Sequence, residues 1–256
     1  MKFFLQIFCL ALVSSCGGGS SELLTPQNPT QTILIPQNDI EILFIGNSHS
    51  ANHDLPQLVA TLLKSGMEDT TVYADLAPGY SFLVDRLGDN VTHEKIKSRN
   101  WSFVILQAQK YSSSGLYSYP TTAAEQWIRR STAQNAVSIM FPEWPRRGNY
   151  EEGLRVHGIH LRIASREPAC VAPVGLAWDH MIAIDPTIPL HAADGNHSNL
   201  NGALLTAYVF YQVISEQSAK ALSYIPEIAV SETNQRIFRE VAADIVAANP
   251  PCENIF

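Results

Sequence analysis

Residues 41–50 read EILFIGNSHS, an apolar run that ends in a glycine, an asparagine and a serine. Four consecutive apolar residues, 42–45, are typical of a strand that is buried on both faces of a parallel sheet. A glycine directly after such a strand permits a tight turn, which would place Ser48 above the carboxyl edge of the sheet. Open α/β sheets carry their active groups at that edge. The segment therefore predicts the first strand of an α/β domain with a serine in a position to react.

The alternation continues along the chain, because each short apolar or β-branched run is followed by a segment with helical periodicity. We expect strands over residues 42–45, 71–76, 103–106, 137–141 and 171–174. We expect helices over residues 55–66, 121–133, 152–165, 201–218 and 231–248, with shorter ones between 82 and 97. Five strands that alternate with helices predict a three-layer α/β/α sandwich around a five-stranded parallel sheet, of the flavodoxin-like kind.

Length and composition fit one larger globular domain. The chain has 256 residues, of which 46% are hydrophobic and 16% are charged. A single α/β domain of this size buries a sizeable core, so no second folded domain is required. The formal net charge is -7, and no run of lysines or arginines stands out. These features argue against a nucleic-acid partner.

The N-terminal residues carry the pattern of an export signal. Lys2 precedes an apolar stretch that is too short to span a bilayer, and the sequence VSSC at residues 13–16 resembles the lipobox of bacterial lipoproteins. The resemblance implies that residues 1–15 are removed, that Cys16 carries lipid, and that the protein is anchored in the cell envelope, in the periplasm or at the outer membrane. A plain secretory signal is the alternative. Residues 16–38 read as a flexible tether, which leaves 39–256 as the folded domain.

Cys170 and Cys252 are the two cysteines of the predicted folded domain. An exported protein could join them in a disulfide. Their spacing in the sequence says nothing of their distance in space, so a disulfide and two buried thiols both stay open.

Ser48 needs a partner base to act as a nucleophile, and the sequence DGNH at residues 194–197 offers one. An aspartate three residues before a histidine can hold one imidazole nitrogen, which leaves the other free to take a proton from a serine. In the simpler alternative, Ser48 only caps a helix, while Asp194 and His197 cap a helix or lie at the surface.

Together these motifs resemble the SGNH branch of the GDSL-type hydrolases over residues 40–220. The resemblance implies that Ser48 is the nucleophile, His197 its base and Asp194 the acid that orients the histidine. Gly79, in the sequence APGYS after the second strand, matches the second block of the family. Its N–H and that of Ser48 would then form the oxyanion hole.

The third block departs from the family pattern G-x-N-D, because residues 104–110 read VILQAQK. Glutamine has the same amide donor as asparagine on a longer side chain. We expect Gln109, or failing that Gln107, to complete the oxyanion hole. The alternative is that both glutamines only form hydrogen bonds within the loop.

The region around 171–178 is similar to the fifth strand of carbohydrate-directed members of the superfamily. Trp178, Trp144 and Tyr80 are therefore candidates to line a sugar-binding cleft, because aromatic faces pack against the apolar faces of sugars. Packing in the core or at its rim is the alternative.

Histidines also raise the hypothesis of a metal site. His157 and His160 share a helix face, and His191 lies close to Asp194 and His197 in the sequence. However, no H-E-x-x-H motif occurs, and the helix of His157 and His160 reads as solvent-facing. We expect neither a metal nor an organic cofactor.

The resemblance implies a serine esterase that hydrolyses O-acyl, and in particular O-acetyl, esters on carbohydrate. Other small esters and a lipase-like action at the membrane are further alternatives. The rival from another class is a non-catalytic carbohydrate-binding or envelope-assembly lipoprotein, which the altered third block motivates.

Overall fold

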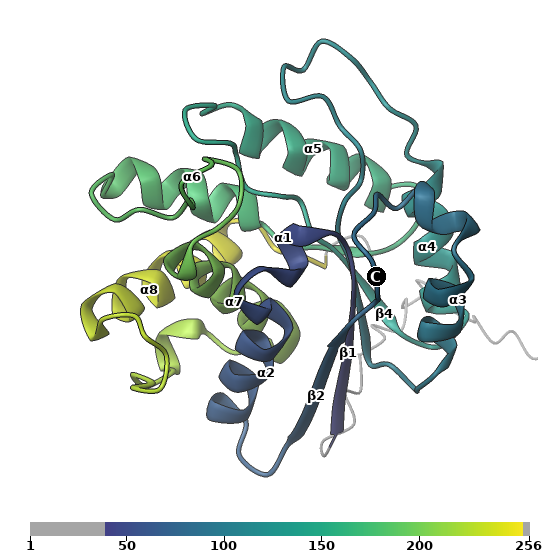
Figure 1. Ribbon diagram of the computed structural model, residues 1–256. Helices are drawn as coiled ribbons and strands as arrows, with labels where there is room; N and C mark the ends of the chain where they lie inside the picture. Colours follow the sequence, from purple (N-terminus) through teal and green to yellow (C-terminus); the bar gives the residue numbers. More distant parts are fainter. Residues whose placement is uncertain (1–38, 253–256) are drawn as a thin grey trace, which may run out of the picture. The chain divides into compact units, whose positions relative to one another are not determined.

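The computed structural model describes residues 39–252, so the predicted signal peptide, the lipidated Cys16 and the tether lie outside the described residues. Five strands form one parallel sheet in the order β2-β1-β3-β4-β5, the flavodoxin-like order (Figure 1). The strands are β1 (Asp39–Ile45), β2 (Thr71–Leu76), β3 (Phe103–Leu106), β4 (Val137–Met140) and β5 (Cys170–Val171). The predicted five-stranded parallel sheet is confirmed.

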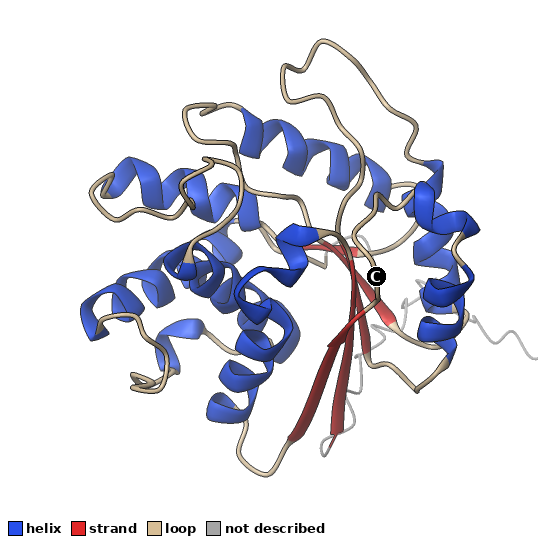
Figure 2. Cartoon of the chain, viewed as in Figure 1, coloured by secondary structure: helices blue, strands red, loops and turns tan. Residues whose placement is uncertain are grey.

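Helices cover both faces of the sheet (Figure 2). They are α1 (Ser48–Ala51), α2 (Leu55–Gly66), α3 (Asn90–Lys97), α4 (Thr122–Thr132), α5 (Glu152–Ala164), α6 (Val174–Ile184), α7 (Leu200–Ser215) and α8 (Glu232–Ala248). Alternate residues of β1 point to opposite faces, so Ile42 and Phe44 join the core beneath α2 and α7, while Leu43 and Ile45 join the core beneath α4. Within residues 39–252, no helix combines the length and the apolar character needed to cross a bilayer.

The predicted elements differ from the observed ones mainly at two places. Ser48 begins the short helix α1, which the sequence did not indicate. The fifth strand ends at Val171 and α6 begins at Val174, where we expected the strand to continue. Pro173 explains the second difference, because proline has no N–H for the sheet and its fixed φ suits the start of a helix.

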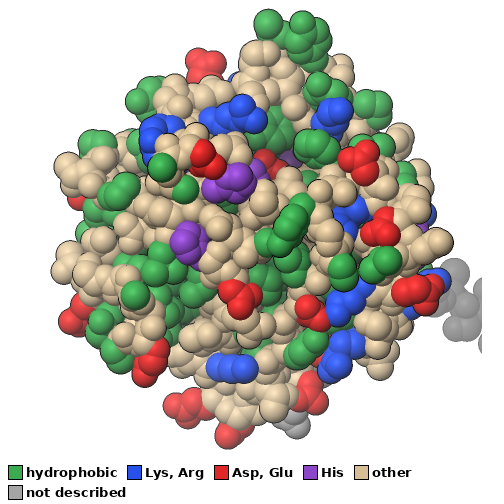
Figure 3. All heavy atoms as spheres, in the orientation of Figure 1, with side chains coloured by type: hydrophobic (Ala, Val, Ile, Leu, Met, Phe, Trp, Pro, Cys, Tyr) green, Lys and Arg blue, Asp and Glu red, His purple; other side chains and the backbone are tan. Residues whose placement is uncertain are grey.

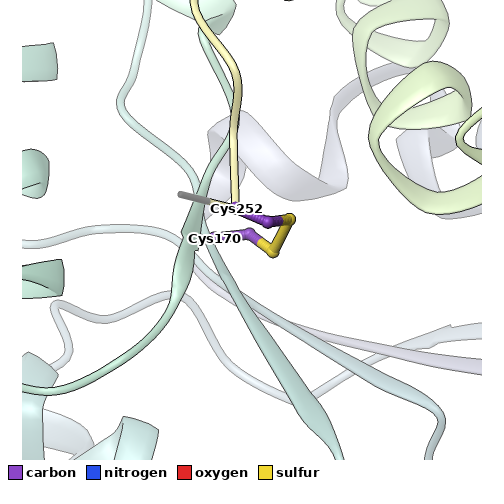
Figure 4. The surroundings of a disulfide bond; sticks show 2 residues. All are labelled: Cys170 and Cys252. Atoms are coloured by element: carbon purple, nitrogen blue, oxygen red, sulfur yellow. A yellow bond between two sulfur atoms is a disulfide. The ribbon is translucent and has the colours of Figure 1, made fainter. Parts of the chain in front are cut away.

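Cys170 and Cys252 form a disulfide, which decides between the two alternatives left open by the sequence (Figure 4). The two Cα atoms lie 4.2 Å apart across 82 residues of sequence. Next to the bond, the Val171 N–H donates to the carbonyl oxygen of Pro251 at 2.6 Å. The disulfide therefore ties the C-terminal segment to β5.

Candidate active site

The turn between β1 and α1 brings Ser48 to the carboxyl edge of the sheet. A Cβ atom on Gly46 would lie 2.4 Å from Gln107 Oε1, so no larger residue fits there without a shift. The Asn47 side chain then caps α1 by accepting the backbone N–H of His49 at 2.9 Å. The glycine and the cap together fix the turn that carries Ser48.

Three of the predicted residues lie in one hydrogen-bonded chain. Ser48 Oγ is 2.8 Å from His197 Nε2, and His197 Nδ1 is 2.5 Å from Asp194 Oδ2. With its Nδ1 proton held by the carboxylate, the imidazole keeps a lone pair on Nε2 to accept the Ser48 proton. The structure thus brings together Ser48, His197 and Asp194 in the order that nucleophilic catalysis requires.

The Asp194 carboxylate is held in its charged form. Its Oδ1 accepts the backbone N–H groups of Asn196 at 2.9 Å and of His197 at 3.0 Å. The hydrogen bond from the His197 ring, aided by these two backbone bonds, keeps the pKa of the Asp194 carboxyl well below its usual range. The carboxylate is therefore ionised at neutral pH, although it is exposed.

The loop of residues 191–198, which carries the acid and the histidine, is tied to two other parts of the site. Asn52 Nδ2, just after α1, donates to the carbonyl oxygen of Ser198 at 2.7 Å. Trp144 Nε1, in the segment after β4, donates to the carbonyl oxygen of Asn196 at 2.9 Å. These bonds fix the loop against both the serine turn and the β4 side.

His49 packs against the catalytic candidates and was not among the residues predicted for the site. Its ring is buried, with its centroid 5.0 Å from that of His197 and 5.0 Å from that of Trp144. Its Nδ1 lies 3.1 Å from Asn47 Oδ1. The tilted His49 ring therefore packs beside the His197 imidazole and limits its movement.

Two backbone N–H groups in the loops at this edge of the sheet, those of Ser48 and Gly79, have no acceptor in the described residues. Gly79 has φ +80°, a conformation that strains any residue with a side chain, and no atom lies within 4 Å of the position of a Cβ there. The position of a side chain at Gly79 is therefore open, and its N–H stays a candidate for the oxyanion hole.

Arg86 is buried, with 1% of its surface exposed, and it holds both the loop after β1 and the loop after β2. Its Nη2 donates to the carbonyl oxygens of Gly46 and Gly79, each at 2.6 Å, and its Nη1 donates to that of Pro78 at 3.0 Å. The carbonyl and the N–H of a trans peptide point in opposite directions, so holding Pro78 O turns the Gly79 N–H away from Arg86. No sequence signal indicated this residue, because its partners come from two separate loops.

The structure does not support Gln109 as the third oxyanion donor. Ala108 has φ +72°, which redirects the chain after β3. The Gln109 amide nitrogen then donates to the carbonyl oxygens of Lys110 at 2.8 Å and Pro120 at 3.1 Å, so both of its hydrogens already have acceptors. Gln109 closes the base of its own loop, as in the alternative that assigned it a loop role.

Gln107 lies beneath the serine turn. Its Oε1 accepts the Asn47 N–H at 2.6 Å and the Ser50 hydroxyl at 3.0 Å, and its Nε2 donates to the carboxylate of Glu143. The side chain is fully buried. Its contacts therefore brace the turn that carries Ser48.

The expectation that Trp178 and Trp144 line a sugar cleft is wrong. Trp178 is fully buried and stacks on Trp144 with ring centroids 4.5 Å apart, while its Nε1 donates to Thr206 Oγ1 at 3.0 Å. Trp144 is also buried and packs against His49 and Phe141, so neither indole offers a face to a ligand. Tyr80 differs, because it is 67% exposed beside Gly79 and remains a candidate for binding substrate.

His157 and His160 are also placed differently from the expectation of a solvent-facing helix face. Both are buried on α5, and burial lowers the pKa of each imidazole to about 4. His191 is engaged elsewhere, with its Nε2 2.7 Å from the carbonyl oxygen of Pro145. In the part of the chain that the structure describes, no group of three or more histidine, cysteine or acidic side chains could hold a metal ion.

Acidic side chains gather behind the site, between the segment after β4, α5 and α6. Glu143 and Glu152 are buried, and the backbone N–H of Arg146 donates to Glu152 Oε2 at 2.7 Å. Asp179 lies close by, and burial together with the charge of Glu152 raises the pKa of its carboxyl to about 7.

No protein-family model and no curated protein matches the chain. Among solved structures, a DUF4886 family protein from Bacteroides uniformis superposes with a TM-score of 0.63 at 15% identity, over 83% of this chain and 96% of its own. A protein of Slackia heliotrinireducens, named as a candidate SGNH hydrolase, gives 0.56 at 21% identity, over 68% and 98%. A catalytic mutant of Axe2, an acetylxylan esterase from Geobacillus stearothermophilus, gives 0.50 at 14%, over 68% and 93%.

At identities this low, the superpositions establish the fold alone. The chain has the α/β fold of the SGNH hydrolases, with a five-stranded all-parallel sheet flanked by helices. The similarity expected from the sequence is therefore confirmed at the level of the fold.

Proposed function

We propose that the protein is a serine esterase in which Ser48, His197 and Asp194 form the catalytic triad. One observation carries the proposal: Ser48 Oγ is 2.8 Å from His197 Nε2, while the other ring nitrogen is held by Asp194. A serine that only caps a helix has no need of a histidine ordered in this way.

In the first step, Ser48 Oγ attacks the carbonyl carbon of the ester while its proton moves to His197 Nε2. The imidazolium that forms is stabilised by the Asp194 carboxylate. His197 then gives the proton to the departing alcohol oxygen, which leaves the acyl group on Ser48.

The oxyanion of each tetrahedral intermediate is bound by the N–H groups of Ser48 and Gly79, which have no other acceptor in the described residues. In the second step, water gives its proton to His197 and attacks the acyl carbon. The proton returns to Ser48 Oγ as the carboxylic acid leaves, which restores the enzyme.

We propose an O-acetylated carbohydrate as the substrate. The fold is shared with an acetylxylan esterase, which supports this choice of ester. Tyr80 supports it too, because its exposed ring stands directly after Gly79, where a sugar face could pack against it.

We also propose that the protein is exported and held in the cell envelope by lipid on Cys16. The disulfide between Cys170 and Cys252 supports export, because such bonds persist in oxidising compartments and are rare in the cytosol. The VSSC sequence at residues 13–16 supports the lipid anchor.

The proposal is tested by hydrolysis of a short-chain aryl acetate by the full-length protein and its Ser48→Ala variant. Ser223→Ala is the matched control, because Ser223 is exposed and makes no hydrogen bond within residues 39–252. We expect the Ser48 variant to lose at least about 10³-fold in kcat and the control to match the parent.

Equal turnover by the parent and the Ser48→Ala variant would exclude Ser48 as the nucleophile. No turnover by either protein, with folding verified by circular dichroism, would favour the rival function of a carbohydrate-binding protein. The third loop motivates this rival, because the Gln109 amide bonds within its own loop and the Gln107 amide donates to Glu143.

A further inference from the structure

A cavity of about 490 Å³ lies between α5 and the β3–α4 loop, which comprises residues 107–121. Figure 1 shows this loop rising beside α5 above the end of the sheet at which α1 lies. The volume is within the range of small-molecule sites, roughly 300–1,000 Å³. The triad residues do not line the cavity, so it is separate from the proposed reaction centre.

The lining of the cavity has an unusual charge for a chain of formal net charge -7. Four cationic side chains face it, and none of the lining residues is acidic. These cations are Lys110, Arg155, Arg162 and Arg166. Figure 3 shows basic, acidic and hydrophobic side chains intermixed over the upper part of the face in view. A cavity of this kind attracts anions from solution.

Two of the four cations are engaged in the structure and two are free to bind a ligand. Arg155 donates to the carbonyl oxygens of Ser112 and Ser113 and so orders the loop, and Arg166 contacts the Glu125 carboxylate at 3.4 Å. Arg162 and Lys110 form no ion pair with any residue of the range 39–252.

Tyrosines supply the rest of the recognition surface. Tyr117 is 72% exposed and Tyr119 is 38% exposed, and both line the cavity. Lys110 Nζ lies 5.1 Å from the centre of the Tyr119 ring, which places a cation beside an aromatic face. Exposed aromatic faces beside cations suit a ligand with an apolar ring face and an anionic group, which is the chemistry of an acidic sugar.

A series of hydrogen-bonded side chains links the lining of the cavity to the turn that carries Ser48. Tyr111 lines it, and the Tyr111 hydroxyl donates to Glu143 Oε2 at 3.4 Å. Glu143 accepts the amide of Gln107, which in turn accepts the Asn47 N–H beside Ser48. The lining of the cavity and the turn that carries Ser48 therefore share supporting side chains.

We propose that this cavity binds the carboxylate of a uronic acid residue, so that the substrate is an O-acetylated acidic polysaccharide. The claim that the cavity binds a uronic acid depends on the cavity alone. The claim about the substrate rests on the proposed esterase function. Arg162 and Lys110 form charged hydrogen bonds with the carboxylate, and Tyr117 packs against the sugar ring.

Binding is measured first, so that the test does not depend on catalysis. The full-length Ser48→Ala variant is titrated with trigalacturonic acid, and with its methyl ester as the uncharged counterpart, by calorimetry at low and at physiological salt. We expect the acid to bind at least about tenfold more tightly than the ester, with an advantage that shrinks as salt rises.

Arg162→Gln in the same background is expected to weaken binding of the acid about tenfold and to leave binding of the ester unchanged. Lys64→Gln is the matched control, because it removes the same charge from an exposed site on α2 and is expected to bind like the parent. Circular dichroism verifies that each variant is folded.

Acetate release then tests the substrate. We expect a higher kcat/KM on acetylated polygalacturonate than on its acetylated methyl ester, with a preference that Arg162→Gln removes and Lys64→Gln keeps. If binding follows this pattern and the parent hydrolyses the aryl acetate while neither polymer is deacetylated, the assignment of the substrate fails; if the aryl acetate is not hydrolysed either, the esterase proposal fails and the binding site stands.

Three results would overturn the binding site: equal binding of the acid and the ester, no binding of either, or no effect of Arg162→Gln. Tighter binding of a sulfated trisaccharide or of inorganic phosphate than of the acid would overturn the assignment to a carboxylate.

Discussion

Two loops at the carboxyl edge of the same sheet were predicted with different success. The loop of residues 191–198 holds Asp194 and His197 as the motif implies, whereas the β3–α4 loop turns Gln109 away from Ser48. The first arrangement is local, because Asp194 binds N–H groups only two and three residues ahead of it. In the second loop, Gln109 bonds to Lys110 and Pro120 of the same loop, while Gln107 bonds to Glu143, 36 residues further along the chain. The hydrogen bonds within the first loop could be expected from spacing, whereas no local pattern indicates the acceptors that the two glutamines use.

The largest expected effect is in the locally determined loop. Asp194→Asn keeps the shape of the side chain but removes the charge that holds the His197 Nδ1 proton, so Nε2 no longer reliably presents its lone pair to Ser48. We expect kcat on an aryl acetate to fall by about 10⁴-fold, with little change in thermal stability.

Asp69→Asn is the control for Asp194→Asn, since Asp69 is exposed and its backbone φ of +65° suits asparagine equally well. A loss of less than about tenfold for Asp194→Asn would show that the carboxylate does not orient the histidine.

Removing the disulfide is expected to lower stability without changing the chemistry that the two loops support. Cys252→Ser releases the C-terminal segment from β5 and is expected to lower the free energy of unfolding by about 2–4 kcal/mol. Because neither loop contains a cysteine, kcat/KM at a temperature well below unfolding should not change. Urea unfolding and aryl acetate kinetics on the same samples measure both quantities, and a large fall in kcat would place the disulfide in the support of the site.

Gln107→Leu tests what the third loop contributes. The variant leaves the partly buried Asn47 N–H and the buried Ser50 hydroxyl without their acceptor, so we expect a loss of about 1–3 kcal/mol in unfolding free energy. If Gln107 only braces the turn, kcat falls by about tenfold. A loss of about 10²–10³-fold in kcat, with unchanged stability, would instead identify Gln107 as a direct oxyanion donor.

The smallest expected effect is a pH dependence of stability from Asp179, behind the two loops. Its pKa of about 7 in the folded chain exceeds the ordinary value of 3.8, so the folded state binds more protons and stability falls as pH rises from about 4 to 7. Asp179→Asn removes this fall.

We therefore expect Asp179→Asn to be more stable than the parent by about 1 kcal/mol at pH 8, because solvent screens a partly exposed carboxyl, and equally stable near pH 4. Thermal unfolding at both pH values measures the difference. Equal stability at pH 8 would mean that the Asp179 carboxyl is not perturbed by folding.

Much of the fold could be predicted because it follows from periodicity. The observed bounds of α2, β2 and β3 agree with the prediction, and the other predicted strands and long helices differ at their ends by a few residues. The helix α6 was missed because the apolar run that contains Val171 and Trp178 fits either a buried strand or a buried helix.

The candidate triad was predicted because Ser48 follows the first strand, and because the D-x-x-H motif of Asp194 and His197 stands before a late helix, as in the family that the sequence resembles. The burial of Trp178 and His160 was not predictable, since it depends on which helix closes over them. Arg86 and Glu143 act through partners far away in the sequence, and no local pattern indicates them.

The most direct test of the triad is covalent labelling of the full-length protein with a fluorophosphonate, followed by mass spectrometry of the peptides. We predict a single adduct on Ser48 in the parent and none in a folded His197→Gln variant, because only an activated serine reacts with this reagent. An adduct on another serine, no adduct in the parent, or equal labelling of Ser48 without His197 would contradict the account.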